Sequence, residues 1–214
     1  MGWIKSVNGV TVAEIILWVV FSFLCGSIPW SVWLGKIFLR KDVRQYGDGN
    51  PGTTNVFRAG SKWLGVLTLM LDISKAAAPV GFAYHNLGIH GFSMVLIALM
   101  PVLGHAFSPF LAFKGGKAVA SAFGVWIGLT IWKASLPAVI FALIGLGVFE
   151  IAGWAVMLAL ASILITLLVW LPEPLFLSVL LGEIIILART HRADLCQPPR
   201  FRSSVRKFFQ RSGR

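Results

Sequence analysis

Charged residues are scarce in this chain of 214 residues. Only 13% of the residues are Asp, Glu, Lys or Arg, and only eight are acidic, whereas a soluble domain spends about a quarter of its residues on charge. Apolar runs recur instead, at 12–28, 92–113, 136–149 and 155–171. These runs approach or reach the roughly 20 residues that a helix needs to cross a bilayer. The composition excludes a single soluble core and predicts an all-α, polytopic membrane protein.

Cysteine and the common catalytic motifs are also lacking. Cys25 and Cys196 are the only cysteines, which excludes a disulfide framework and a C-x-x-C metal site. The sequence contains no G-x-S-x-G elbow, no H-x-x-x-x-D acyltransferase box and no H-E-x-x-H zinc site. We therefore expect no metal, no other cofactor and no nucleophile supplied by the protein.

The apolar stretches predict seven membrane spans, near residues 12–35, 63–84, 92–113, 119–132, 136–149, 154–170 and 174–190. Some stretches are short or interrupted and could re-enter or merge, so six spans are the alternative. Lys5 before the first stretch resembles the start of a secretory signal, but no A-x-A-like cleavage site follows, and we expect a retained helix. A membrane domain is expected at 1–190, with a basic tail at 191–214.

Positive charge is concentrated on one side of this topology. Of the 19 Lys and Arg residues, eight lie in 36–62 and 114–118, and another eight lie from Arg189 onward. Because cytoplasmic loops carry the excess of Lys and Arg, we expect a cytoplasmic C-terminus, an external N-terminus and a location in the cell (plasma or inner) membrane.

The net charge of +11 indicates anionic partners. No nucleic-acid recognition motif accompanies it, so nucleic acid is not expected. Membrane lipid headgroups and phosphorylated substrates fit better, and we expect the terminal segment 197–214 to lie against anionic lipid. The sequence does not indicate which oligomeric state the protein adopts.

The most informative segment is the polar loop 46–58, which carries glycines on both sides of Asn50. Glycine lets backbone N–H groups converge on an anion, while Thr54, Asn55 and Arg58 add donors suited to phosphate. The alternative is an ordinary Gly/Asn/Pro turn between two spans, but the length and donor density of the loop favour binding. The residues expected to bind phosphate here are Gly49, Asn50, Gly52, Thr54 and Asn55.

A second glycine-rich element places Lys114 and Lys117 on either side of Gly115 and Gly116, before another apolar run. Helix N-termini and ammonium groups both favour an oxyanion. A P-loop is excluded because G-x-x-x-x-G-K-[ST] is absent. The alternative is a pair of interfacial lysines that snorkel to headgroups. The expected position on the same membrane face as the first loop favours phosphate binding.

Four of the ionisable residues in or near apolar segments are candidates for a functional role. Asp72 and Lys75 are three residues apart, so they share a helix face and could pair. Charges at membrane depth are costly and indicate function, although a structural ion pair is nearly as well supported. His105 and His191 are candidate bases or phosphate ligands, but a lone histidine more often serves only as a hydrogen-bonding group.

In combination and order, these motifs resemble those of the bacterial membrane acyl-phosphate:glycerol-3-phosphate acyltransferases, the PlsY type. The resemblance runs through 26–29, 49–58, 71–75, 104–105, 113–117 and, weakly, 190–192. It implies a seven-helix membrane fold with a cytosolic active site. It also implies transfer of a fatty acyl group from acyl phosphate to the sn-1 hydroxyl of glycerol 3-phosphate, which gives lysophosphatidic acid for phospholipid biosynthesis.

The resemblance also implies residue roles. Lys117, His191 and Arg58 would be the catalytic residues that hold the two anionic substrates. The residues beside the phosphates would be Gly49, Asn50, Gly52, Thr54, Asn55, Gly115, Gly116 and His105. Acyl phosphate carries its own leaving group, which can accept the proton of the attacking hydroxyl. Positioning and charge neutralisation would then suffice without a covalent acyl-enzyme.

Three positions depart from the family pattern. Asp48 stands where the family usually has Ser, Asp194 stands where it has Asn after the histidine, and Gly153 lies where a serine-containing stretch is expected. A carboxylate at Asp48 would repel phosphate unless it turns away or is neutralised. The alternatives to the family reaction are a non-catalytic relative that binds anionic lipid or phosphate, and an acyltransferase with a different acceptor.

Overall fold

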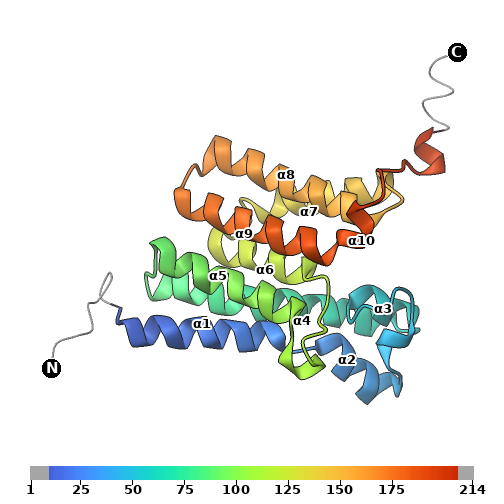
Figure 1. The fold of residues 1–214 in the computed structure, drawn as a ribbon, viewed down its shortest axis with the longest axis horizontal. Helices are drawn as coiled ribbons and strands as arrows, with labels where there is room; N and C mark the ends of the chain where they lie inside the picture. The colour runs from blue at the N-terminus through green and yellow to red at the C-terminus, as the bar shows by residue number, and fades with distance from the viewer. Residues whose placement is uncertain (1–9, 207–214) are drawn as a thin grey trace, which may run out of the picture. The chain divides into compact units, whose positions relative to one another are not determined.

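The computed structural model describes residues 10–206, and all regular elements in that range are helical. The expected all-α class is therefore confirmed. The chain divides into two compact units, Met1–Ile131 and Trp132–Arg214. Figure 1 labels the helices of both units.

The first unit opens with α1 (Val12–Ser27). A capping box starts this helix, because the Thr11 hydroxyl accepts the Glu14 N–H at 3.2 Å and the Glu14 carboxylate accepts the Thr11 N–H at 2.7 Å. Proline disfavours helical geometry in the residue before it, and α1 ends just before Ile28 and Pro29. The predicted span 12–35 is thus a broken helix, which resumes as α2 (Trp30–Leu34) and the π-helix η1 (Gly35–Leu39).

Short elements and three longer helices complete the first unit. They are η2 (Val43–Gln45), α3 (Thr53–Arg58), α4 (Lys62–Gly81) with η3 (Phe82–Asn86), α5 (Gly91–Ala106) with η4 (Pro109–Leu111), and α6 (Val119–Thr130). Helix α5 packs along α1, and α6 packs along α4 (Figure 1).

Glycines let these helix pairs approach closely. A side chain at Gly104 of α5 would collide with the Phe23 carbonyl of α1. A side chain at Gly124 of α6 would likewise collide with the Ile73 carbonyl of α4. Small residues are typical where membrane helices cross, because they allow backbones to touch. The two helix pairs therefore hold fixed positions for the loops that connect them.

The second unit contains α7 (Ser135–Val148), α8 (Ala152–Trp170), α9 (Pro174–Thr190) and the short α10 (Arg192–Leu195). Helix α8 packs against α7, α9 and α10. Part of the chain after α10 returns to the α7–α8 junction, where the Glu150 N–H donates to the Arg200 carbonyl at 2.9 Å. The Arg206 guanidinium also lies 3.2 Å from the Glu150 carboxylate.

Two contacts hold this part of the basic tail against the second unit. Arg206 pairs with Glu150, and the backbone of Phe201 pairs with that of Phe149. Contact of the tail with anionic lipid stays a prediction, because residues 200–204 and 206 are exposed. The rest of the predicted lipid-binding segment, residues 207–214, lies outside the described residues.

Four helical segments within residues 10–206 are long and apolar enough to cross a membrane: Val12–Leu39, Lys62–Asn86, Gly91–Leu111 and Ala152–Trp170. Helices α6 and α7 are apolar but shorter. Large apolar side chains are exposed on α1 and α8, for example Leu17 and Val169, which suits contact with lipid. The seven-span topology, its orientation and the division at residue 190 stay predictions.

Candidate functional site

The loop between η2 and α3 bends around two glycines. Gly47 and Gly49 have φ values of 60° and 74°, a left-handed conformation that glycine adopts without strain. A side chain at Gly47 would collide with the Arg58 guanidinium and the Asn55 amide oxygen. The close packing explains why this loop carries glycine and why two polar residues of α3 lie against it.

Asp48 lies at the centre of the polar contacts in this loop. Its carboxylate accepts hydrogen bonds from the Asn50 backbone N–H at 3.2 Å and from the Asn55 amide at 3.0 Å. The Lys117 ammonium lies 3.1 Å away from it. We call Asp48, Asn50, Asn55 and Lys117 the loop cluster. Residues predicted from two separate motifs thus meet in one place.

The charge of Asp48 is well compensated. Partial burial acts to raise the pKa of this carboxyl, but the Asn50 N–H, the Lys117 ammonium and the Asn55 amide together lower the pKa below its ordinary value. The carboxyl is therefore ionised at neutral pH. The sequence predicts that Asp48 either turns away from the phosphate site or is neutralised. In the structure the Lys117 ammonium neutralises its charge.

The remaining predicted donors of the loop surround this cluster. Arg58 at the end of α3 is exposed, and its guanidinium lies 3.5 Å from the Asn55 amide oxygen. Thr54 is exposed on the first turn of α3, and Gly52 caps that helix with an extended backbone. The loop therefore gathers hydrogen-bond donors of backbone, amide and guanidinium type, as an anion site requires.

Gly115 and Gly116 are expected to donate their backbone N–H groups to phosphate, but in the structure these groups bond to the protein. Their N–H groups donate to the carbonyls of Ala106 and His105, at 3.1 and 2.9 Å. Side chains at these positions would collide with the His105 backbone and ring. In this structure the glycine pair clamps its loop onto the end of α5, which fixes the position of Lys117.

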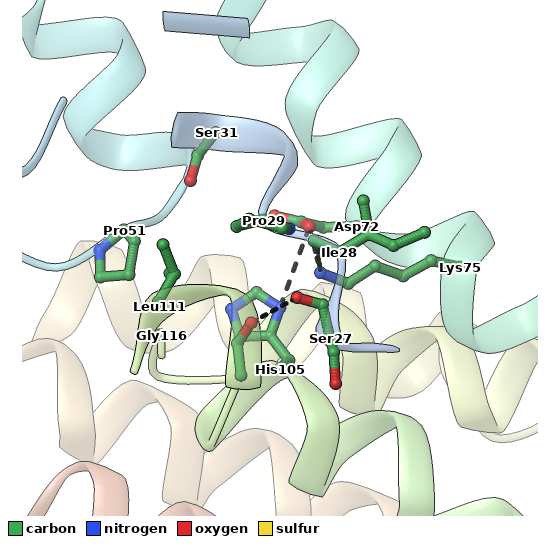
Figure 2. Close-up of a pocket in the computed structure, with 11 residues that line it drawn as sticks. Ser27, Ile28, Pro29, Ser31, Pro51, Asp72, Lys75, His105, Leu111 and Gly116 are labelled. Atoms are coloured by element: carbon green, nitrogen blue, oxygen red, sulfur yellow. Dashed lines mark hydrogen bonds and ion pairs between the residues drawn. The ribbon is translucent and has the colours of Figure 1, made fainter. Parts of the chain in front are cut away.

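A buried polar network lies beneath that loop. The ammonium of Lys75 is 2.7 Å from the carboxylate of Asp72 and donates to the Ile28 carbonyl at 2.8 Å. The Nδ1 atom of His105 lies 3.1 Å from the Ser121 hydroxyl and 3.9 Å from Asp72. The predicted pairing of Asp72 and Lys75 is present, and Figure 2 shows it beside His105.

This network borders a small, partly open cavity with room for about one water molecule. Its polar side chains come from the end of α1, from α2, from α4, and from α5 and the loop after it (Figure 2). His105 is buried here, 8% exposed, so it supports the glycine loop from below rather than facing the solvent. The lining residues are Ser27, Ile28, Pro29, Ser31, Pro51, Asp72, Lys75, His105, Ser108, Leu111 and Gly116.

The second unit carries His191 and two of the three positions that depart from the family pattern. His191 is buried, and its Nδ1 atom lies 3.0 Å from the Leu187 carbonyl. Gly153 at the start of α8 faces α10, where an added Cβ atom would lie 2.6 Å from the Cβ atom of Asp194. The changes at these two positions therefore meet in one contact.

Sequence reasoning missed several residues of the first unit. Ser121 contacts His105, and the Ser108 hydroxyl donates to the Ser27 carbonyl at 2.6 Å. Ser121 lies in the first turn of α6, only four residues after Lys117, and this closeness in the chain is the signal that could have pointed to it. Among residues 10–206, no group of three or more His, Cys, Asp or Glu side chains is placed to hold a metal ion.

Comparison with known proteins places these features in a family context. A model described as glycerol-3-phosphate acyltransferase matches residues 16–197. A glycerol-3-phosphate acyltransferase of Streptococcus gordonii is 37% identical over 188 residues, which cover 84% of this chain and 87% of that protein. Glycerol-3-phosphate acyltransferase 2 of Lactobacillus acidophilus is 36% identical over 187 residues, which cover 83% of each chain.

Solved structures give the same result. The glycerol 3-phosphate form of PlsY (YgiH), an integral membrane glycerol 3-phosphate acyltransferase, aligns with a TM-score of 0.79 and 29% identity. That alignment covers 92% of this chain and 99% of the PlsY chain. The lysophosphatidic acid form aligns with a TM-score of 0.73 and 32% identity, covering 85% and 90% of the two chains.

Proposed function

Because the chain belongs to the glycerol-3-phosphate acyltransferase family, we propose that it transfers a fatty acyl group from acyl phosphate to the sn-1 hydroxyl of glycerol 3-phosphate. The products would be lysophosphatidic acid and inorganic phosphate. The observation that carries this proposal is the loop cluster, in which Lys117 meets the Asn50 N–H and the Asn55 amide around one anionic group. Such a donor set suits a phosphate.

The proposed step needs no nucleophile from the protein. The sn-1 hydroxyl oxygen forms a bond to the acyl carbonyl carbon, the bond between that carbon and the phosphate oxygen breaks, and the hydroxyl proton goes to the departing phosphate. The protein lowers the barrier by holding the two substrates together and by neutralising their charge.

The residues take the following parts in this proposal. Asn50, Asn55 and Lys117 hold a substrate phosphate, with Arg58 and Thr54 beside them on α3. The glycine pair and His105 position Lys117, because they fix the loop that precedes α6. His191, in the second unit, keeps the substrate-holding role that the family resemblance implies.

The proposal includes a location. The chain is a multi-pass membrane protein by its apolar helices and its integral membrane relative. We place it in the cell (inner) membrane with its active site on the cytoplasmic face, since the loops that carry the loop cluster also carry the positive charge typical of that side.

Lys117→Ala tests this function. The protein is purified in detergent, and phosphate release from palmitoyl phosphate is followed with and without glycerol 3-phosphate. We expect phosphate release that requires glycerol 3-phosphate. Lys117→Ala should abolish this release, because the substrate phosphate loses the ammonium group that neutralises its charge. Lys133→Ala is the control, since Lys133 is exposed and predicted on the opposite side of the membrane. Equal rates in parent and Lys117→Ala would contradict the proposal.

A binding protein without turnover is the second candidate. The carboxylate of Asp48 at the centre of the loop cluster favours it, because an internal anion already satisfies the donors. The same assay separates the two candidates. A folded preparation that binds phosphate and releases none from palmitoyl phosphate would support the second candidate, and another acceptor would then be sought.

A further inference from the structure

The carboxylate of Asp48 takes contacts that a phosphate group would need. It is held by a backbone N–H at 3.2 Å, an amide at 3.0 Å and an ammonium group at 3.1 Å. These are the donor types that recognise any oxyanion. One donor set cannot fully satisfy two anions, and two like charges within about 4–6 Å oppose each other.

We propose that Asp48 is a specificity-determining residue that occupies the loop cluster until a substrate phosphate displaces it from Lys117. The inference rests on the proposed function, because it takes the loop cluster to be the phosphate site of the acyl transfer. It goes beyond that function by assigning Asp48 the role of an internal competitor.

The exposure of the pair permits such an exchange. The side chains of Asp48 and Lys117 are 49% and 31% exposed, and Asp48 lies between two glycines in the left-handed conformation. A second ion pair with lysine in the first unit, Asp72 with Lys75, is only 3% and 4% exposed. Water can solvate the carboxylate of Asp48 when it moves away from Lys117, whereas the carboxylate of Asp72 is almost fully buried.

The competition sets what the site accepts. The Asp48 carboxylate is tethered beside the donors, so it competes with any free anion for them. A singly charged anion that displaces Asp48 therefore binds weakly. A phosphate monoester carries up to two negative charges and three terminal oxygens, and it can replace the contacts that Asp48 gives up. The site therefore favours phosphate over carboxylate ligands, at the cost of weaker phosphate binding.

Asp48→Asn and Asp48→Ser test the inference. Both variants remove the charge, and both leave a polar group that can accept a hydrogen bond. The apparent Kd for inorganic phosphate is measured on the full-length protein in detergent, from the rise in unfolding midpoint at constant ionic strength. Removing one like charge should tighten phosphate binding about tenfold, the effect of about one pKa unit of interaction.

Asp42→Asn is the matched control. Asp42 is also an ionised loop acid, because the hydrogen bond from Arg44 lowers its pKa to about 2. Its carboxylate pairs with Arg44 at 2.7 Å, a residue outside the loop cluster. Its substitution should leave the phosphate Kd unchanged. The measurement does not use acyl transfer, so the inference stands if turnover is absent and phosphate still binds tighter to the Asp48 variants.

Three results would overturn the inference. An unchanged or higher phosphate Kd in both variants would show that Asp48 positions Lys117 rather than competing for it. An equal gain in Asp42→Asn would show a general effect of charge. Failure of both Asp48 variants to fold would show that Asp48 is a structural residue.

Discussion

At Asp72 and Lys75, opposite charges lie 2.7 Å apart with almost no solvent. The desolvation cost of such a pair offsets much of its attraction, but removal of one partner leaves an uncompensated buried charge. Lys75 also donates to the Ile28 carbonyl at the helix break. The pair therefore holds α4 against the segment that borders the cavity.

Lys75→Met should destabilise the protein by about 3–5 kcal/mol, because it strands the carboxylate of Asp72. The double variant Asp72→Asn/Lys75→Met should recover most of that loss, since no buried charge remains. Unfolding midpoints in detergent measure both effects. A double variant that is no more stable than Lys75→Met would show that the Ile28 contact, rather than the charge pair, dominates.

The sequence identified most residues of the loop cluster individually but not their arrangement. Glycines, amides and lysine have recognisable phosphate chemistry, so Asn50, Asn55 and Lys117 were predictable. The contact between Asp48 and Lys117 joins residues 69 positions apart, and no local pattern reports such a distance. Ser121 was missed for the same reason, because its partner His105 lies on another helix.

Helix α8 meets α10 through a contact that leaves no room for a side chain at Gly153. Gly153→Ala places a methyl group against the Cβ atom of Asp194, and overpacking of this kind costs about 1–3 kcal/mol. Asp194→Gly removes that Cβ atom and should rescue Gly153→Ala, whereas Asp194→Ala keeps it and should not.

A double-mutant cycle on unfolding midpoints measures this coupling. Similar stability of the two double variants would argue against a direct contact. If the coupling is found, the departures from the family pattern at Gly153 and Asp194 count as one linked change.

The predicted spans coincide with helices because long apolar runs have few other folds in a bilayer. The break after α1 was not predicted, although Pro29 marks it. The residues on both sides of the break are apolar, so a hydropathy profile cannot show that the helix is interrupted there. The break leaves the carbonyls of Ser27 and Ile28 without helical partners. The Ser108 hydroxyl and the Lys75 ammonium donate to them, and the hydropathy pattern does not reveal these contacts.

For the whole molecule, the charge distribution predicts an odd number of crossings. A fluorescent protein fused after residue 214 should be bright, because its chromophore matures in the cytoplasm. A periplasmic reporter such as alkaline phosphatase should be inactive in that position and active when fused before residue 1. Activity of the alkaline phosphatase at both ends would contradict the predicted topology and favour six crossings.

The buried ion pair also bears on how the protein is synthesised. An Asp or a Lys at the centre of a helix costs about 2.5–3.5 kcal/mol during insertion by the translocon, and α4 carries both. The ribosome makes α1 and the Ile28 carbonyl before it makes α4, so an acceptor for Lys75 already exists when α4 emerges. Helix α4 should therefore enter the lipid together with α1 rather than alone.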